Sequence, residues 1–409
     1  MKKVELLAPA GDLEKLETAL RFGADAVYLG TERFGLRALA GNFDLGQLRQ
    51  ARDLCRAQGK KLYLTLNAWL RPQEFPDLAA LLEELRPLDF DAYIVGDPGV
   101  LATVRQVDAA RPLHLSTQAN TTNAQGVNFW AAAGVARVNL ARELRLEEIR
   151  AIRAATACEL EVFVHGALCV AYSGRCLLSA ALTGREANRG LCAHPCRWRY
   201  ALMEETRPGE YFPVEEDERG TYVFNSRDLC LVEHLPELVA AGVDSLKIEG
   251  RMKSVYYVAA VTRVYRAALD RCLADPRGFA LDPEWRAELD KVSHRPYGTG
   301  FLFGGEGAGV HAADSAYVRA CDFVGVVREE GESLVVQGRN RFLPGETLEI
   351  IGPAMRTAAF CVNEIRSLEG DSLPAGQPNR LVRLTLPEGT QAGDLLRRPV
   401  KSLGDTDQI

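Results

Sequence analysis

Short apolar runs alternate with amphipathic stretches along the first two-thirds of the chain. The runs have the length of β-strands, and the stretches between them repeat apolar residues every three or four positions, the period of an α-helix. Helices are expected at residues 13–22, 45–57, 75–85 and 146–155. The expected strands are residues 4–10, 26–30, 61–67, 92–97, 112–116, 137–141, 161–166 and 244–250.

Strands that alternate with helices predict parallel βαβ units and an α/β fold. Eight strands is the number that closes a TIM-like (β/α)8 barrel, so we expect a barrel domain over residues 1–310. An open doubly wound sheet is the alternative, because a count of strands does not show closure. No GxGxxG turn follows any of the strands, which disfavours that alternative.

The regular spacing breaks after the seventh strand. About eighty residues separate Gly166 from Asp244, and five of the ten cysteines fall in this gap, four of them clustered between positions 169 and 196. An insertion after a barrel strand lies at the C-terminal face, where barrel enzymes carry out their chemistry. We therefore expect a cysteine-bearing insertion, about residues 167–243, beside the active site.

The pattern changes again near residue 310. Residues 318–409 form short alternating runs separated by PGE, EGD, PEG and AGD turns. Such a pattern is typical of an antiparallel sheet, and it predicts a small C-terminal antiparallel β-barrel domain.

Composition and charge narrow the class of protein. The 409 residues are 47% hydrophobic and 25% charged, as in ordinary globular proteins, and no apolar run is long enough to span a membrane. With no secretory signal at the start, we expect a cytoplasmic protein without a membrane partner. The net charge of −6 argues against general binding of polyanions, so an RNA partner needs a local basic surface.

The clustered cysteines are Cys169, Cys176, Cys192 and Cys196, separated by six, fifteen and three residues. Cytoplasmic cysteines rarely form disulfides, and four thiolates suit either a 4Fe-4S iron–sulfur cluster or a tetrahedral zinc ion. Structural zinc favours pairs two to four residues apart, so the six-residue gap favours the cluster. Buried thiols or a redox pair are the remaining alternatives.

His165 lies four residues before Cys169, which raises the possibility of a Cys–His nucleophilic pair. The structural alternative is that His165 forms a hydrogen bond within the barrel mouth. We favour this alternative, because a cysteine that binds a cluster is not available as the nucleophile.

Polar residues follow several of the strands, where a barrel brings strand ends together around one pocket. Asn225–Asp228 is either a helix N-cap made by Ser226 or Asp228, or an anion site in which Arg227 binds a carboxylate. A pocket lined by Arg37, Arg142, Arg227 and Arg251 would suit a dianionic small molecule. No single residue is assigned as catalytic. The predicted substrate-binding residues are Arg37, Asn67, Gln118, Asn120, Arg142, His165, Asn225, Arg227, Glu249, Arg251 and Lys253.

Two stretches resemble the collagenase-like peptidase family U-32, namely EVFVHGALCVAYSGRCLLS and NRGLCAHPCRW. The similarity extends over nearly the whole chain to the TrhP-type branch of that family, which hydroxylates tRNA. Its other segments include HLSTQAN, RVNLARELRLEEI, GTYVFNSRDLCLVEHL and SLKIEGRMKSVYYVA. No HExxH, P-loop or GxSxG motif is present, so the sequence gives a peptidase no support.

The resemblance implies an iron–sulfur barrel protein that forms 5-hydroxyuridine at the wobble position of tRNA. In that branch the reaction depends on prephenate and does not need molecular oxygen. The cluster ligands of the family match the four clustered cysteines, and the two carboxylates of prephenate suit an arginine-rich pocket. Two alternatives remain, a peptidase that uses a cysteine or an unrecognised base, and a non-catalytic cluster-binding partner in a modification complex.

Overall fold

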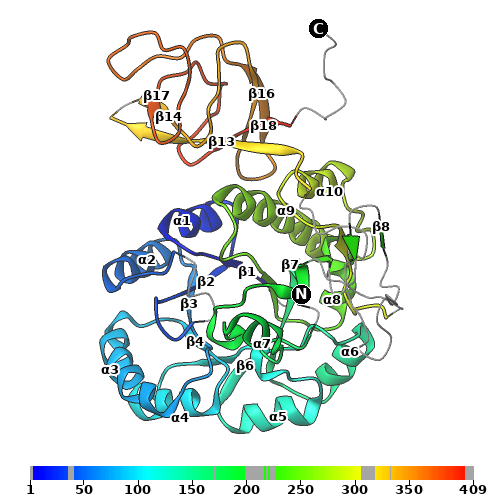
Figure 1. The fold of residues 1–409 in the computed structure, drawn as a ribbon. Helices are drawn as coiled ribbons and strands as arrows, with labels where there is room; N and C mark the ends of the chain where they lie inside the picture. The colour runs from blue at the N-terminus through cyan, green and yellow to red at the C-terminus, as the bar shows by residue number, and fades with distance from the viewer. Residues whose placement is uncertain are drawn as a thin grey trace, which may run out of the picture.

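The structure, a computed structural model, describes residues 3–35, 41–169, 171–198, 216–217, 220–221, 227–304, 318–331 and 333–400. Eight parallel strands form a barrel (Figure 1). β11 pairs with both β7 and β1, so the ring is closed and the open-sheet alternative is wrong. Each barrel strand overlaps one predicted run: β1 (Glu5–Pro9), β2 (Ala26–Gly30), β3 (Lys61–Leu66), β4 (Ala92–Val95), β5 (Leu113–Leu115), β6 (Val135–Asn139), β7 (Glu159–Ala167) and β11 (Ser245–Ile248).

Helices surround the barrel (Figure 1). Polar side chains cap the N-termini of several of them. Asp12 accepts a hydrogen bond from the backbone N–H of Lys15 at 2.9 Å, which satisfies a donor that the first helical turn leaves open. Among the described residues, no helix is both long and apolar enough to cross a membrane. The helices around the barrel are α1 (Leu13–Arg21), α2 (Leu45–Ala57), α3 (Phe75–Leu85), α4 (Pro98–Val107), α5 (Ala124–Ala132), α6 (Leu146–Ala154), α8 (Leu235–Ala240), α9 (Val255–Ala274) and α10 (Pro283–Asp290).

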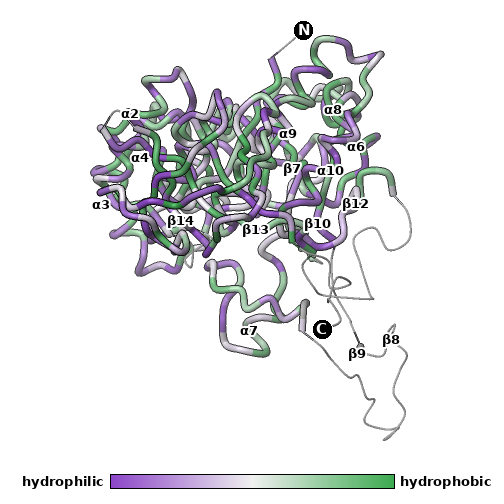
Figure 2. The backbone as a smooth tube through the Cα atoms, turned by 90° about the horizontal axis from the view of Figure 1, so that it is seen from above, coloured by the Kyte–Doolittle hydropathy of each residue, from purple (hydrophilic) through white to green (hydrophobic). Residues whose placement is uncertain are grey.

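The insertion leaves the carboxyl end of β7, as predicted. It contains α7 (Leu178–Thr183), and Figure 2 shows this helix standing clear of the barrel body on one side. The chain continues through β8 (Glu216–Asp217) and β9 (Gly220–Thr221). It returns as β10 (Asp228–Cys230), which runs antiparallel to β7, and β12 (Tyr297–Gly298) then pairs with β10.

The helix cap predicted for Asp228 is wrong. Asp228 belongs to β10, where it pairs with Ala167 of β7, and its carboxylate accepts hydrogen bonds from Arg295 at 2.7 and 3.0 Å. Both side chains are almost fully buried. The ion pair therefore anchors the end of the insertion to the barrel.

The C-terminal part forms an antiparallel six-stranded sheet with its own small core, which includes Val336, Phe342 and Leu396. Its sheet order is β16-β15-β18-β13-β14-β17. The strands are β13 (Cys321–Glu330), β14 (Ser333–Gly338), β15 (Thr347–Ile351), β16 (Thr357–Cys361), β17 (Leu381–Val382) and β18 (Leu395–Pro399).

A buried ion cluster joins the two parts. Arg397 of β18 is fully buried and binds Glu288 of α10 as well as Glu349 of β15. Glu288 also binds Arg263 of α9. Because separating these buried partners is costly, the cluster holds the C-terminal sheet against α9 and α10.

Candidate functional site

Three amide side chains at the carboxyl ends of β3 and β5 form a connected group. Asn67 donates Nδ2 to the hydroxyl of Ser116 at 3.1 Å. Gln118 donates Nε2 to the hydroxyl of Ser173 at 3.0 Å, and Asn120 donates Nδ2 to the backbone oxygen of Gln118 at 3.0 Å. The structure thus brings three predicted site residues together and links them to the start of the insertion.

Arg251 lies across the neighbouring strands β2 and β3. Its guanidinium is buried and donates to Thr65 Oγ1 and Asn42 Oδ1, each at 3.0 Å. A Cβ at Gly30 would stand 2.5 Å from Arg251 Nη2, so only glycine leaves room there. Thr65 comes two residues before Asn67, which places this cation beside the amide group.

Arg142 lies on the other side of the ring, between β6 and β7. It donates to the backbone oxygen of Ala167 at 3.2 Å, and its guanidinium carbon is 5.7 Å from the centre of the Phe163 ring. Arg142 also lines a hollow of only about 30 Å³. This hollow is too small for a substrate, although the guanidinium stands at the barrel rim.

Glu249 and Lys253 follow β11, as predicted, and each contacts a different neighbour. Glu249 accepts a hydrogen bond of 3.5 Å from the Tyr28 hydroxyl. Lys253 donates to the backbone oxygen of Ser293 at 3.0 Å. Lys253 therefore faces the segment after α10.

Arg227 does not join the other two arginines on the ring of eight strands. Its side chain is exposed and lies against Gly298 of β12, on the antiparallel extension beyond β7. Arg142, Arg227 and Arg251 therefore lie at three different positions around the barrel and do not form the single pocket that we expected. Arg37 and Asn225 lie outside the described residues.

The structure does not place His165 with the other predicted residues at the barrel mouth. The pairing of β7 with β11 contains a β-bulge. Lys247 pairs with Phe163, but the next residue of β11, Ile248, pairs with His165, so β7 has one extra residue between these pairs. This bulge turns His165 outward, onto the face of Ile248, whereas Phe163 faces inward. Its ring nitrogens each lie 3.4 Å from a tyrosine hydroxyl, those of Tyr265 and Tyr297.

Burial, which disfavours the imidazolium, lowers the pKa of His165 to about 3. The ring is therefore neutral at pH 7 and packs among tyrosines. A Cys–His nucleophilic pair with Cys169 has no support in this arrangement.

One contact within the cysteine-bearing insertion, and one between the insertion and the barrel domain, fix its conformation and position. Ser179 of α7 is buried and accepts a hydrogen bond of 2.9 Å from the backbone N–H of Ala193, next to Cys192. Arg189 binds both carboxylate oxygens of Glu74 at 2.8 Å. This bidentate hydrogen bond from Arg189 lowers the pKa of Glu74 to about 2. The insertion is thereby tied to the start of α3.

The cysteines themselves lie near the surface. Cys169 is exposed, and Cys176, Cys192 and Cys196 are half-buried. The backbone N–H of His194 donates to Cys192 Sγ at 3.4 Å.

Within the described part of the chain, no three or more His, Cys, Asp and Glu side chains stand close enough together to hold one metal ion. A single zinc ion needs all its sulfur ligands within about 2.3 Å, whereas a cubane cluster binds each thiolate through a different iron. By the chemistry of their thiolates, the four cysteines of the insertion are a donor set that fits an iron–sulfur cluster or a zinc ion.

The barrel interior contains a charged network that the sequence patterns did not reveal. Arg137 of β6 binds Glu5 of β1 and lies 3.4 Å from Glu161 of β7, and Lys247 of β11 binds Glu161 at 2.8 Å. Burial alone would raise the pKa of Glu5, but Arg137 and Tyr63 hold that pKa below its usual value. The available signal was a charged residue within each of four strands that are otherwise rich in apolar residues.

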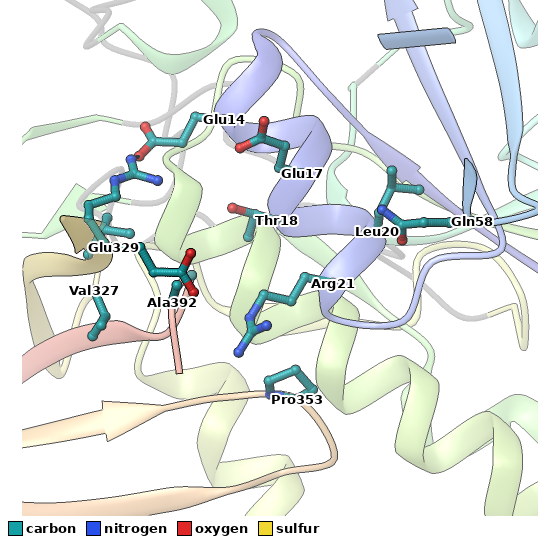
Figure 3. Close-up of a pocket in the computed structure, with 13 residues that line it drawn as sticks. Glu14, Glu17, Thr18, Leu20, Arg21, Gln58, Val327, Glu329, Pro353 and Ala392 are labelled. Carbon is teal, nitrogen blue, oxygen red and sulfur yellow. Dashed lines mark hydrogen bonds and ion pairs between the residues drawn. The ribbon is translucent and has the colours of Figure 1, made fainter. Parts of the chain in front are cut away.

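A cavity of about 570 Å³ lies away from the strand ends. It is between α1 and the C-terminal sheet, as Figure 3 shows, with Glu17 and Arg21 on its α1 side. Arg21 binds Asp394 at 2.8 Å, and Glu14 binds Arg328. Ion pairs between the barrel domain and the C-terminal sheet line this cavity, so we interpret it as part of the interface between them. We therefore place the candidate site at the barrel mouth.

By its structure this is a β/α barrel protein with a cysteine-bearing insertion at the barrel mouth. Sequence comparison shows the family to which it belongs. The sequence model of peptidase family U32 matches residues 11–312, and that of the U32 C-terminal domain matches residues 319–397. The chain belongs to peptidase family U32.

Three similar proteins have names that refer to the modification of RNA. The chain is 38% identical to tRNA hydroxylation protein P1 of Bacillus subtilis (strain 168), over 97% of this chain and 95% of that protein. It is 36% identical to tRNA hydroxylation protein P of Escherichia coli (strain K12), over 91% of each chain. It is also 37% identical to the 23S rRNA 5-hydroxycytidine C2501 synthase of Escherichia coli (strain K12), over 72% of this chain and 44% of that enzyme.

Proposed function

We propose that this protein is a cytoplasmic tRNA-modifying enzyme that forms 5-hydroxyuridine at the wobble position. In this proposal prephenate is the co-substrate, molecular oxygen is not needed, and Cys169, Cys176, Cys192 and Cys196 hold a 4Fe-4S cluster. The names of relatives that are similar along almost the whole chain support RNA hydroxylation over peptidase activity.

One geometric observation carries the proposal. The insertion that bears the cysteines packs directly on the polar strand ends, where Ser173 accepts a hydrogen bond from Gln118. A group held by these cysteines would therefore lie beside the barrel mouth. When bound, an iron–sulfur cluster supplies one-electron transfer.

The protein's own residues supply binding and charge at this mouth. Arg251 offers a buried guanidinium that suits one carboxylate of a dianion such as prephenate. Burial in a region of low dielectric strengthens such an interaction relative to an exposed pair. Arg142, across the ring, is the second candidate partner for an anion.

Anaerobic reconstitution tests the proposal. The purified chain, loaded with iron and sulfide and incubated with tRNA and prephenate, should yield 5-hydroxyuridine by nucleoside mass spectrometry. Replacement of Cys192 by Ser should lower the iron and sulfide content and abolish the product. Absence of product from the loaded wild-type protein acting alone would overturn the enzyme assignment and favour a non-catalytic partner.

Arginine variants test the co-substrate site. Arg251→Met should abolish hydroxylation while the iron content and the visible absorbance of the protein stay at wild-type levels. Arg105→Met is the matched control, because Arg105 of α4 binds the backbone oxygen of Ala109 away from the mouth. Full activity of Arg251→Met would refute the arginine site.

A further inference from the structure

Each amide at the barrel mouth donates one hydrogen bond within the protein through its nitrogen, whereas its oxygen has no hydrogen-bond partner among the described residues. Asn67 Oδ1, Gln118 Oε1 and Asn120 Oδ1 are buried, and none has a hydrogen-bond partner among the described residues. The Gln118 side chain belongs to a residue only 8% exposed. Buried acceptors that lack a protein partner need a donor such as a water molecule or a ligand, and three of them lie close together here.

The three side chains follow strands β3 and β5 of the barrel, and we call them the amide arc (Asn67, Gln118 and Asn120). Gly96 at the end of β4 lies close to two of these residues, because a Cβ there would stand 3.1 Å from Gln118 Cβ and 3.2 Å from the backbone oxygen of Asn67. The arc spans the ends of β3, β4 and β5. In the order of the barrel strands, Arg251 borders it at β2–β3 and Arg142 at β6–β7.

The polarity of the amide arc selects the kind of ligand. Its open atoms are acceptors, so it pairs with N–H and O–H donors and not with carboxylates, which are themselves acceptors. Uracil presents an N3–H donor on its pairing edge, and ribose presents hydroxyls. A dianion such as prephenate finds its complement in the guanidinium groups that border the arc.

We propose that the amide arc binds the donor-bearing edge of the target nucleoside, while Arg251 binds the anionic co-substrate at its border. This inference rests on the proposed function and divides its substrates between two neighbouring surfaces. The arc thereby distinguishes a neutral base from an anion by the direction of hydrogen bonding alone.

Burial of the arc restricts how the nucleotide enters. Gly174 of the insertion packs on Gln118, and a Cβ at that glycine would overlap Gln118 Oε1. A base that remains stacked in a helix does not reach so covered a side chain. The arc therefore accepts an unstacked nucleotide, as loops of single-stranded RNA provide.

Binding measurements on the cluster-loaded protein test the inference. The probes are prephenate alone and two anticodon stem–loop RNAs, one with uridine and one with 3-methyluridine at the wobble position. Gln118→Met should weaken binding of the uridine RNA about tenfold, the effect of one lost hydrogen bond to a buried group. Its affinity for prephenate should stay within about twofold of wild type. Gln106→Met on the exposed face of α4 is the matched control.

The methylated RNA identifies the contact. It lacks the N3–H donor, so the wild-type protein should bind it about tenfold more weakly, and Gln118→Met should add no further loss. Asn67→Ala provides a second variant, which should weaken binding of the uridine RNA and leave prephenate binding unchanged, and unchanged iron content shows that the fold is retained. Equal additional losses on both RNAs, or weaker prephenate binding with normal RNA binding, would overturn the inference. Loss of product with this binding pattern intact would instead refute only the proposed reaction.

Discussion

Lys247 Nζ lies 2.8 Å from Glu161 Oε1 inside the barrel, and the two side chains are only 5% and 3% exposed. The ammonium group also lies 4.5 Å from the centre of the Tyr28 ring and 5.4 Å from that of Phe163. Lys247 thus connects the charged network of the interior with aromatic side chains beneath the mouth. Buried charges are costly without partners, so each member of this network depends on the others.

Replacement of Glu161 by Gln should therefore destabilise the fold strongly. It leaves Lys247 and Arg137 facing a neutral amide, and we expect a loss of about 3–5 kcal/mol in the free energy of unfolding. Urea unfolding followed by circular dichroism measures this change. The control is Asp77→Asn, whose partner Arg33 is 65% exposed, and which should cost about 1 kcal/mol or less. Equal effects of the two substitutions would contradict the buried network.

Alanine substitutions at two glycines of the insertion distinguish the effect of backbone strain from the effect of contact with the barrel mouth. Gly174 and Gly184 have φ values of 72° and 70°, but only at Gly174 would a Cβ meet Gln118, and nothing lies within 4 Å at Gly184. Alanine at either position carries a similar backbone cost of about 1–2 kcal/mol. Gly174→Ala should in addition displace the insertion and lower tRNA hydroxylation roughly tenfold or more.

Activity assays beside thermal unfolding distinguish these effects. Gly184→Ala should lower the melting temperature about as much as Gly174→Ala while it retains most of the activity. If both variants lose activity equally, the contact between Gly174 and Gln118 has no part in the reaction.

His165 makes the stability of the protein depend on pH. Its pKa is about 3 in the folded protein because of burial, and about 6.5 in an unfolded chain. Between pH 3 and pH 6.5 the unfolded state binds a proton on His165 that the folded state does not bind. The contribution of His165 to the free energy of unfolding is therefore fully present above pH 6.5 and decreases as the pH is lowered toward 3. His165→Phe should reduce this slope by up to about 1.4 kcal/mol per pH unit.

Urea unfolding at a series of pH values between 4 and 8 measures the slope. The control is His234→Phe, at a partly exposed position beside Glu237. An unchanged slope for His165→Phe would mean that His165 is protonated in the folded protein, contrary to its placement among tyrosines.

Much of the fold follows from local sequence patterns. All eight barrel strands and four of the helices could be predicted, because the period of apolar residues records which face of each element is buried. The place of the insertion followed as well, since parallel strands carry their connections at fixed ends. The amides and Arg251 could be expected at the mouth for the same reason.

What the sequence could not determine depends on contacts between distant strands. The bulge that turns His165 outward arises from its register with β11, more than eighty residues along the chain, and no local period records it. The interior network also needs four strands brought into one ring before Glu5, Arg137, Glu161 and Lys247 can compensate one another. The sequence by itself therefore determined the elements, their order and the cysteine spacing. Only the tertiary structure decided which way each polar side chain faces and which partner it meets, because these depend on strand pairing across the barrel.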